Sequence, residues 1–184
     1  MSRPGGRGIL RRRVIFLTHA SMTDQKKKNG EGWDPVTIRR MEVEDVERVL
    51  PIAAETPYNP WSKKMILEEM AHPFSYCFII RQRTGSREAL LLGFLCFRQI
   101  GEESELLNLC IHPEFRQQGL GKKLMSFYID FCEKKGANKY FLEVNISNAP
   151  AIHLYHLFGF RSLGKRKNFY QGRQDALLMT RSVS

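Results

Sequence analysis

Long hydrophobic runs are absent from this chain of 184 residues. No apolar stretch approaches the ~20 residues that a membrane-spanning helix needs. Residues 14–17 are apolar and follow three arginines, as at the start of a signal peptide, but a signal-peptide core needs at least ~7 apolar residues. Hydrophobic residues still make up 42% of the chain, which is enough for a buried core. We therefore expect a cytoplasmic globular protein.

Cysteine pairs and histidine clusters with metal-binding spacing are also missing. None of the four cysteines belongs to a CxxC motif, and three of them stand in apolar, strand-like runs. This pattern argues against a zinc site or a disulfide framework and predicts reduced cysteines in the core. His153 and His156 lie three residues apart on a predicted helix, but the five histidines show no metal-ligand spacing. We expect no bound metal.

Acidic residues are outnumbered, with 19 against 29 lysines and arginines, so the net charge is +10. Half of this excess falls in residues 1–34, which are rich in Gly, Arg and Lys and show no sustained period. We expect this extension to be disordered and the folded domain to occupy residues 35–184. Two hypotheses for the extension are translation from Met22, which would make residues 1–21 an artefact, and a basic arm that contacts RNA. The basic body suits an anionic cofactor, an acidic partner or ribosomal RNA.

Hydrophobic periodicity and turn signals predict the order β–α–α–β–β–β–α–β–α–β–β from residue 35 onward. Pro51 is expected to end or kink the first helix. The order implies an α/β fold of the α+β type, with a mixed central sheet of about six or seven strands and about four helices on its two faces. The expected helices are 42–54, 62–70, 120–135 and 148–158. The expected strands are 36–39, 75–81, 89–99, 103–111, 140–145, 160–167 and 176–181, with a hairpin turn at 84–86.

The most informative segment is the turn at 116–122, with the sequence Arg-Gln-Gln-Gly-Leu-Gly-Lys. It follows the predicted strand that ends at Ile111 and opens the helix that begins at Leu120. A helix N-terminus presents unpaired backbone N–H groups and the positive end of the helix dipole, so it suits a phosphate group. Gly119 and Gly121 have no Cβ atom, which lets a ligand approach the backbone. The turn therefore predicts a phosphorylated cofactor.

Two blocks of the sequence resemble the GNAT superfamily of N-acetyltransferases. Residues 108–122 are similar to its acetyl-CoA-binding motif, in which Arg116, Gly119 and Gly121 fill the fixed positions. Residues 142–160 resemble its second half, where an Asn begins a helix, a Tyr lies within it and Gly-Phe closes it. The resemblance implies a single-domain GNAT fold that uses acetyl-CoA as its cosubstrate.

Within the superfamily the closest resemblance is to RimI, the ribosomal-protein alanine N-acetyltransferases. Residues 60–62, 142–155 and 168–179 carry it. Departures occur at 145–146, where Asn-Ile replaces the frequent Arg-Ala, and at Pro150. The resemblance implies transfer of acetyl to the N-terminal α-amine of a ribosomal small-subunit protein, by direct attack in a ternary complex.

The resemblance also implies a set of cofactor-binding residues. The turn would give N–H groups to the pyrophosphate, and the strand before it would pair with the pantetheine arm like an added strand. A backbone N–H of Cys110 or Ile111 would stabilise the oxyanion. Asn148 has two compatible roles, as helix N-cap and as partner of the pantetheine amide, and Gly121→Val is expected to raise the KM for acetyl-CoA. The candidates are Leu109, Cys110, Ile111, Arg116, Gln117, Gln118, Gly119, Leu120, Gly121, Lys122 and Asn148.

Two residues are candidates for the chemistry. Glu143 is the candidate general base, because a terminal amine with a pKa of ~7.7–8.0 needs only one carboxylate acting through a water; the alternative is a solvated or ion-paired strand glutamate. Tyr155 stands seven residues after Asn148, which matches the position of the superfamily's general acid. The resemblance therefore implies that Tyr155 protonates the CoA thiolate, and the alternative is a core tyrosine. Trp61 and Tyr170 are candidate walls of a peptide groove, with simple packing as the alternative.

Three functions therefore remain open. The first is N-terminal acetylation of a protein, and the second is acetylation of lysine side chains or a small amine. The third is a non-catalytic module that binds acetyl-CoA or docks on RNA, because a fold alone does not establish activity. The intact set of glycine turn, Glu143 and Tyr155 favours an enzyme.

Overall fold

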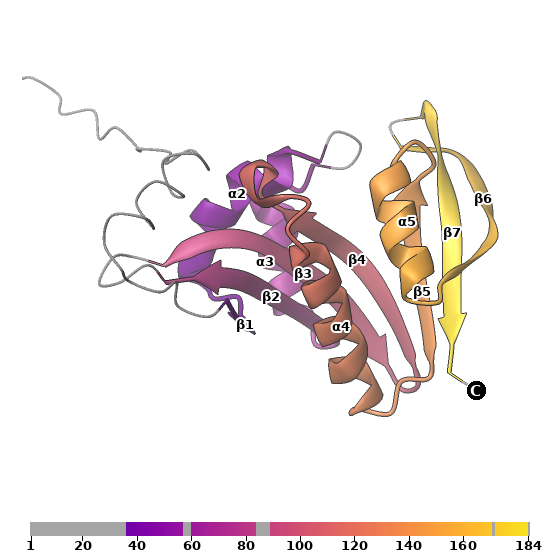
Figure 1. Ribbon diagram of the computed structural model, residues 1–184, viewed down its shortest axis with the longest axis horizontal. Helices are drawn as coiled ribbons and strands as arrows, with labels where there is room; N and C mark the ends of the chain where they lie inside the picture. Colours follow the sequence, from indigo (N-terminus) through magenta and orange to yellow (C-terminus); the bar gives the residue numbers. More distant parts are fainter. Residues whose placement is uncertain (1–35, 57–59, 84–88, 171, 184) are drawn as a thin grey trace, which may run out of the picture. The chain divides into compact units, whose positions relative to one another are not determined.

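The computed structural model of the protein describes residues 36–56, 60–83, 89–170 and 172–183. They form a seven-stranded mixed sheet with the order β1-β2-β3-β4-β5-β7-β6 (Figure 1). The predicted fold is confirmed, with seven strands and four α-helices in the described ranges. The strands are β1 (Thr37–Arg40), β2 (Ser75–Gln82), β3 (Leu90–Ile100), β4 (Glu103–Ile111), β5 (Lys139–Asn145), β6 (Arg161–Tyr170) and β7 (Gln174–Ser182). The helices are α2 (Val46–Ala54), α3 (Lys63–Ala71), α4 (Leu120–Glu133) and α5 (Ala149–Leu157). The N-terminal extension and the hairpin turn at 84–86 lie outside the described residues.

Helix α2 continues past Pro51, so of the two expected effects the end of the helix is excluded, and the kink stays a prediction. Proline removes one backbone hydrogen bond from a helix and crowds the preceding turn. The apolar face of α2 runs on through Ile52 and Ala53, which are buried together with Val49. Burial of this face on the sheet offsets the cost of the proline.

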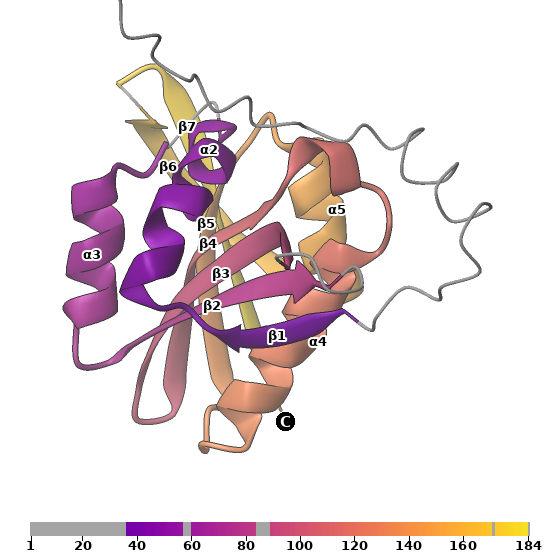
Figure 2. The ribbon, with the colours of Figure 1, turned by 90° about the vertical axis from the view of Figure 1, so that its left-hand side faces the viewer.

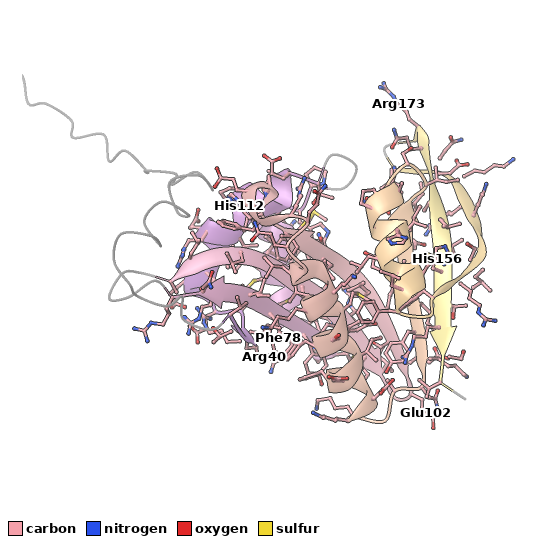
Figure 3. All side chains as sticks on the ribbon, in the orientation of Figure 1. Arg40, Phe78, Glu102, His112, His156 and Arg173 are labelled. Carbon is pink, nitrogen blue, oxygen red and sulfur yellow. The ribbon has the colours of Figure 1, made fainter. Side chains whose placement is uncertain are left out.

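Helices cover the two faces of the sheet separately (Figure 2). On one face, Val49 of α2 and Ile66 of α3 belong to a buried cluster with Cys96 of β3. On the other face, the ring centroids of Phe78 in β2 and Phe127 in α4 lie 4.7 Å apart. Figure 3 shows Phe78 next to α4. Helix α5 lies on the same face as α4, over β5 and β7 (Figure 1). A ligand in the middle of the sheet therefore meets different elements on each face.

The ladder between β4 and β5 is incomplete. The parallel pairing runs from Glu103↔Lys139 to Leu106↔Leu142 and then stops. At the same point β4 contains a bulge against β3, because Leu106 and Asn108 pair with consecutive residues of β3 and Leu107 pairs with none. A bulge bends its strand and increases the local twist. Beyond Leu107 the two strands diverge and leave a wedge in the sheet (Figure 1).

Candidate active site

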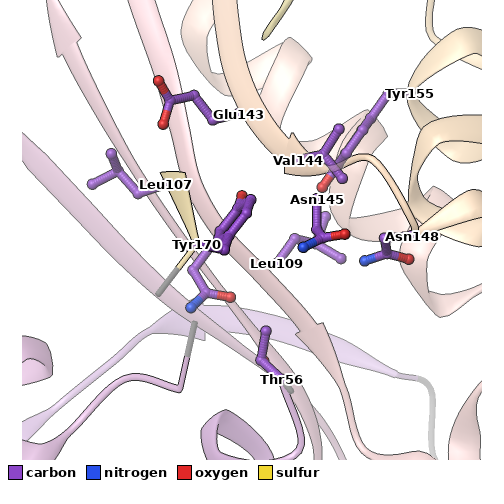
Figure 4. Close-up of a pocket in the computed structure, with 10 residues that line it drawn as sticks. Thr56, Leu107, Leu109, Glu143, Val144, Asn145, Asn148, Tyr155 and Tyr170 are labelled. Atoms are coloured by element: carbon purple, nitrogen blue, oxygen red, sulfur yellow. The ribbon is translucent and has the colours of Figure 1, made fainter. Parts of the chain in front are cut away.

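A pocket of about 70 Å³ lies in the wedge between the ends of β4 and β5 (Figure 4). This is room for a few water molecules or a small reacting group. The pocket brings together five of the predicted site residues, which come from four different elements. Its lining residues are Thr56, Leu107, Asn108, Leu109, Glu143, Val144, Asn145, Asn148, Tyr155 and Tyr170.

Side chains of β5 alternate between the two faces of the sheet at this pocket. Phe97 contacts Tyr128 of α4, with ring centroids 4.8 Å apart, and it pairs with Leu106. Leu106 in turn pairs with Leu142, so these side chains share the face that α4 covers. Glu143 is the next residue along β5. It therefore points to the opposite face, on the side of α2.

Tyr155 approaches the pocket from the α4 side. Its ring contacts Phe160, which contacts Tyr140, which contacts Tyr128 of α4. Figure 4 shows its hydroxyl directed into the space between β4 and β5. The predicted base, Glu143, and the predicted acid thus reach one pocket from opposite faces of the sheet.

Glu143 is partly accessible to water, with 24% of its side chain exposed. Its Oε1 accepts a hydrogen bond from Nη1 of Arg166 at 3.3 Å. The carboxylate acts on its neighbours: burial, and then the charge of Glu143, raises the pKa of Glu105. Burial and the same charge raise the pKa of Tyr170 to about 12. The site combines one weak ion pair with access to solvent, which a base acting through water requires.

Burial controls the protonation of Tyr155. Only 8% of the residue is exposed. Burial raises the pKa of Tyr155 well above its usual value of 10, and the nearby Cys110 and Tyr170 raise it further. The hydroxyl therefore stays protonated at neutral pH, as a proton donor must.

The glycine turn has the backbone that the sequence predicts for a phosphate site. Gly119 is the N-cap of α4 and adopts φ +79°, a left-handed conformation that favours glycine. A Cβ atom at Gly119 would have no neighbour within 4 Å, so the space beside the turn is open. The first N–H groups of the 14-residue helix have no partner within the helix. Nε of Arg116 donates to the Ile111 carbonyl at 3.1 Å and ties the turn to the end of β4. These features fit a pyrophosphate.

Gly121 faces α5 and not the open side of the turn. A Cβ atom there would lie 3.3 Å from Cδ2 of Leu154. Gly121 therefore lets the first turn of α4 pack closely on the helix that carries Tyr155. Valine at position 121 would therefore press on α5, and it would not fill the phosphate turn.

The backbone of β4 presents alternate residues to the wedge. The His112 N–H donates to the Leu92 carbonyl of β3 at 2.8 Å. Alternation along the strand then turns the Cys110 backbone toward β3, whereas Leu109 and Ile111 turn theirs toward the wedge. Of the two predicted oxyanion donors, Ile111 is thus the one whose N–H faces the pocket side. The Cys110 thiol is buried, which raises its pKa, and it contacts the Thr56 hydroxyl at 2.8 Å.

The remaining candidates divide between the pocket and the core. Asn148 lines the pocket, and its Oδ1 caps α5 by accepting from the Ala151 N–H at 3.3 Å. Tyr170 also lines the pocket. Trp61 is only 8% exposed, belongs to the cluster beneath α2 and α3, and does not line the pocket.

Five lining residues were not among the predicted site residues, namely Thr56, Leu107, Asn108, Val144 and Asn145. The two asparagines carried a usable signal, because each interrupts an apolar strand where burial of an amide needs a reason. Thr56 carried none.

No three or more His, Cys, Asp or Glu side chains in the described part of the chain are placed to hold a metal ion. No helix within the described ranges combines the length and apolar character needed to cross a bilayer.

Comparison with known proteins identifies relatives along most of the chain. The [ribosomal protein bS18]-alanine N-acetyltransferase of Escherichia coli (strain K12) is 30% identical over 151 residues, which cover 80% of this chain and 98% of the relative. A Bacillus subtilis (strain 168) relative, which carries the same name provisionally, is 33% identical over 144 residues, or 77% of this chain and 92% of the relative.

Solved structures share the fold. The crystal structure of the Escherichia coli ribosomal-protein-S18-alanine N-acetyltransferase matches with a TM-score of 0.71 and 30% identity, over 82% of this chain and 95% of that one. Arabidopsis thaliana NAA60 in complex with acetyl-CoA matches in fold, with a TM-score of 0.71 and 18% identity, over 81% and 99% of the two chains. The profile of the Acetyltransferase (GNAT) family matches residues 46–160. The chain therefore belongs to the GNAT family of acetyltransferases.

Proposed function

We propose that this acetyl-CoA-dependent N-acetyltransferase acts on the N-terminal α-amine of a protein, namely the N-terminal alanine of a ribosomal small-subunit protein. The relatives support this substrate, because both are named as alanine N-acetyltransferases of ribosomal protein bS18, the Bacillus subtilis one provisionally, and they align over at least 92% of their own length. The observation that carries the proposal is the placement of Glu143 and Tyr155 on opposite faces of one pocket.

Acetyl-CoA supplies an activated acetyl group as a thioester. The turn from Gln117 to Lys122 would hold its diphosphate through backbone N–H groups at the start of α4. The backbones of Leu109 and Ile111, which face the wedge, would pair with the pantetheine arm, and the Ile111 N–H would donate to the carbonyl oxygen as it gains charge. Asn148 also lines the pocket and would bind the pantetheine amide through its side-chain N–H groups, because its Oδ1 already accepts from the Ala151 N–H.

Two proton movements complete the proposed mechanism. Glu143 takes a proton from the acceptor amine through a water, because the amine must be neutral to attack. Tyr155 gives its hydroxyl proton to the sulfur that leaves. Since the two side chains lie on opposite faces, the acceptor enters from the α2 side and the cofactor from the α4 side, which is the geometry of direct transfer in a ternary complex.

A thiol-release assay with matched peptides tests this function. We expect turnover on a peptide with a free N-terminal alanine and none on an N-acetylated peptide with an internal lysine. Glu143→Gln should lower kcat by ~10²-fold or more. Glu68→Gln, in an exposed pair with Lys64 on α3, is the matched control and should keep wild-type kcat. Turnover on the lysine ε-amine alone would contradict the proposal, and tight acetyl-CoA binding without turnover on any peptide would indicate a non-catalytic module.

The domain division belongs to the same proposal. We place the acetyltransferase domain at residues 35–184 and propose that residues 1–34 form a basic extension that contacts RNA. Its charge supports this, with half of the net excess in that stretch.

A further inference from the structure

Three asparagines line the pocket, and two of them are held by the protein. Asn145 uses both ends of its amide: Nδ2 donates to Oε1 of Gln174 at 2.5 Å, and Oδ1 accepts from the Ser147 N–H at 2.8 Å. Asn148 caps α5. Asn108 is different, because its side chain makes no hydrogen bond with any residue that the structure describes.

The low exposure of Asn108 is unusual for a side-chain amide without a hydrogen-bond partner among the described residues. Only 9% of the residue is exposed, and that exposure lies in the pocket that it lines. Buried polar side chains in native proteins are almost always paired with a protein group or with water. The Asn108 amide is not among the fully enclosed polar atoms that lack a partner, so it is open to the space of the pocket. An amide that no described side chain uses and that opens into a pocket is available to a group that arrives with the ligand.

The bulge at Leu107 determines the face of the sheet on which the Asn108 side chain lies, and therefore which ligand it contacts. Leu106 faces α4, so regular alternation would return Asn108 to that same face, where the cofactor enters. The extra residue in β4 turns Asn108 over, and it pairs instead with Cys96, whose side chain belongs to the cluster beneath α2. Asn108 therefore shares the face of Glu143. On that side the ligand is the acceptor and not acetyl-CoA.

We propose that the Asn108 amide recognises the first residue of the acceptor, with Oδ1 accepting an N–H of the α-amine and Nδ2 donating to the first carbonyl. The inference rests on the proposed function and deepens it. An α-amine has a carbonyl two atoms away, which one amide can reach together with the amine. A lysine ε-amine has only methylene groups at that distance. Asn108 thus selects α-amines by their chemistry, separately from the proton transfer at Glu143.

The test compares two acceptors in the thiol-release assay. One is an alanyl peptide, and the other is its alkene isostere, which keeps the amine and the methyl group but lacks the first carbonyl. We expect the wild-type enzyme to favour the peptide by about tenfold in kcat/KM, the effect of one good hydrogen bond. In Asn108→Ala this preference should vanish while the KM for acetyl-CoA stays within twofold. The near-isosteric Asn108→Asp, which has no N–H donors, should lose it too.

A second measurement separates recognition from a structural role. Asn108→Ala removes no internal hydrogen bond, so its melting temperature should equal or exceed that of the wild type, whereas Asn145→Ala should melt earlier because it loses two. An unchanged peptide preference in folded Asn108→Ala would overturn the inference and leave the proposed function standing. A loss of stability in Asn108→Ala equal to that of Asn145→Ala would also overturn it. Wild-type turnover on lysine alone would overturn both.

Discussion

At the residue scale, Tyr155 combines a packing role with a proposed chemical one. Its ring packs on Phe160, with centroids 6.1 Å apart, and its hydroxyl reaches the pocket. Phenylalanine keeps the ring and removes the proton, so Tyr155→Phe should fold normally and lower kcat by ~10²-fold or more, with both KM values within a few-fold. Steady-state kinetics of thiol release checks this.

Tyr140→Phe is the matched control for that variant. Tyr140 is fully buried in the same aromatic row, but its hydroxyl donates to the Ala137 carbonyl and lies outside the pocket lining. Its removal should change stability and leave kcat near that of the wild type. A wild-type kcat in Tyr155→Phe would take this residue out of the mechanism.

The sequence could supply Glu143 and Tyr155 because both stand in a motif with fixed spacing. It could single out Asn108 as a polar residue in an apolar strand but not the face on which its side chain lies, since the face of a strand residue depends on every residue before it. One unpaired residue, Leu107, reverses that face, and nothing in the local sequence announces the bulge. Trp61 stands at a motif position that made it a candidate groove wall with simple packing as the alternative, and the structure places its side chain in the buried cluster.

At the element scale, Gly93 sets the distance between β3 and β4. A Cβ atom there would lie 2.4 Å from the Cys110 carbonyl oxygen, which is closer than atoms can approach. Gly93→Ala must therefore displace the end of β4, at a cost of ~1–3 kcal/mol in the free energy of unfolding. Because the displaced segment includes Ile111, the KM for acetyl-CoA should rise as well. Urea denaturation and kinetics measure the two effects.

Gly164→Ala in β6 is the control for this change. A Cβ atom there would meet only Cδ1 of Leu178, at an ordinary 3.9 Å. Its free energy of unfolding should stay within ~0.5 kcal/mol of the wild type. Equal effects of the two substitutions would show that contact with Cys110 is not the cause.

The small distance between the Gly121 backbone and Leu154 leads to a second prediction, about the packing of α4 on α5. Gly121→Val should push α5 away from α4, raise the KM for acetyl-CoA and lower kcat, since α5 carries Tyr155. Adding Leu154→Ala makes room for the valine, so the double variant should recover part of both losses. Kinetics of the three variants decides the matter, and a double variant no better than Gly121→Val would refute the steric explanation.

The elements themselves were predictable, because helix and strand periods are local properties of the sequence. The structure confirms their order, while β6 reaches Tyr170, beyond the expected end at 167. This difference has a reason: β6 is an exposed edge strand with register shifts against β7, so its sequence lacks the apolar alternation of a half-buried strand. The length of the β4–β5 pairing depends on bulges and twist and could not be predicted.

At the scale of the whole molecule, buried ion pairs make stability depend on pH. Asp45 is 5% exposed, and burial alone would raise its pKa. Two hydrogen bonds from Arg39, at 2.7 Å each, and one from the Glu42 N–H outweigh burial and lower the pKa below its ordinary 3.8. A carboxyl with a lowered pKa stabilises the fold above its ordinary value and loses this effect as pH falls through the folded-state value. Glu69, paired with Arg98, acts with the same sign.

We therefore expect the free energy of unfolding to be level near neutral pH and to decline as the pH falls below about 4. Asp45→Asn should be less stable than the wild type at pH 7, and the difference between the two should shrink in acid. Urea denaturation from pH 3 to 7 measures both curves. A constant difference across that range would show that the charge of Asp45 is not what stabilises the fold.

The short ladder between β4 and β5 has a mechanical consequence. In the described part of the chain, four residue pairs, Glu103–Leu106 with Lys139–Leu142, make up the strand pairing between the half of the sheet that contains β1–β4 and the half that contains β5, β7 and β6. The angle between β4 and β5 beyond this pairing fixes how far Glu143 of β5 lies from the backbone of Ile111 in β4. A substitution that weakens the β4–β5 pairing, even far from the turn at Gly119, would therefore lower the rate of acetyl transfer without removing any group that takes part in it.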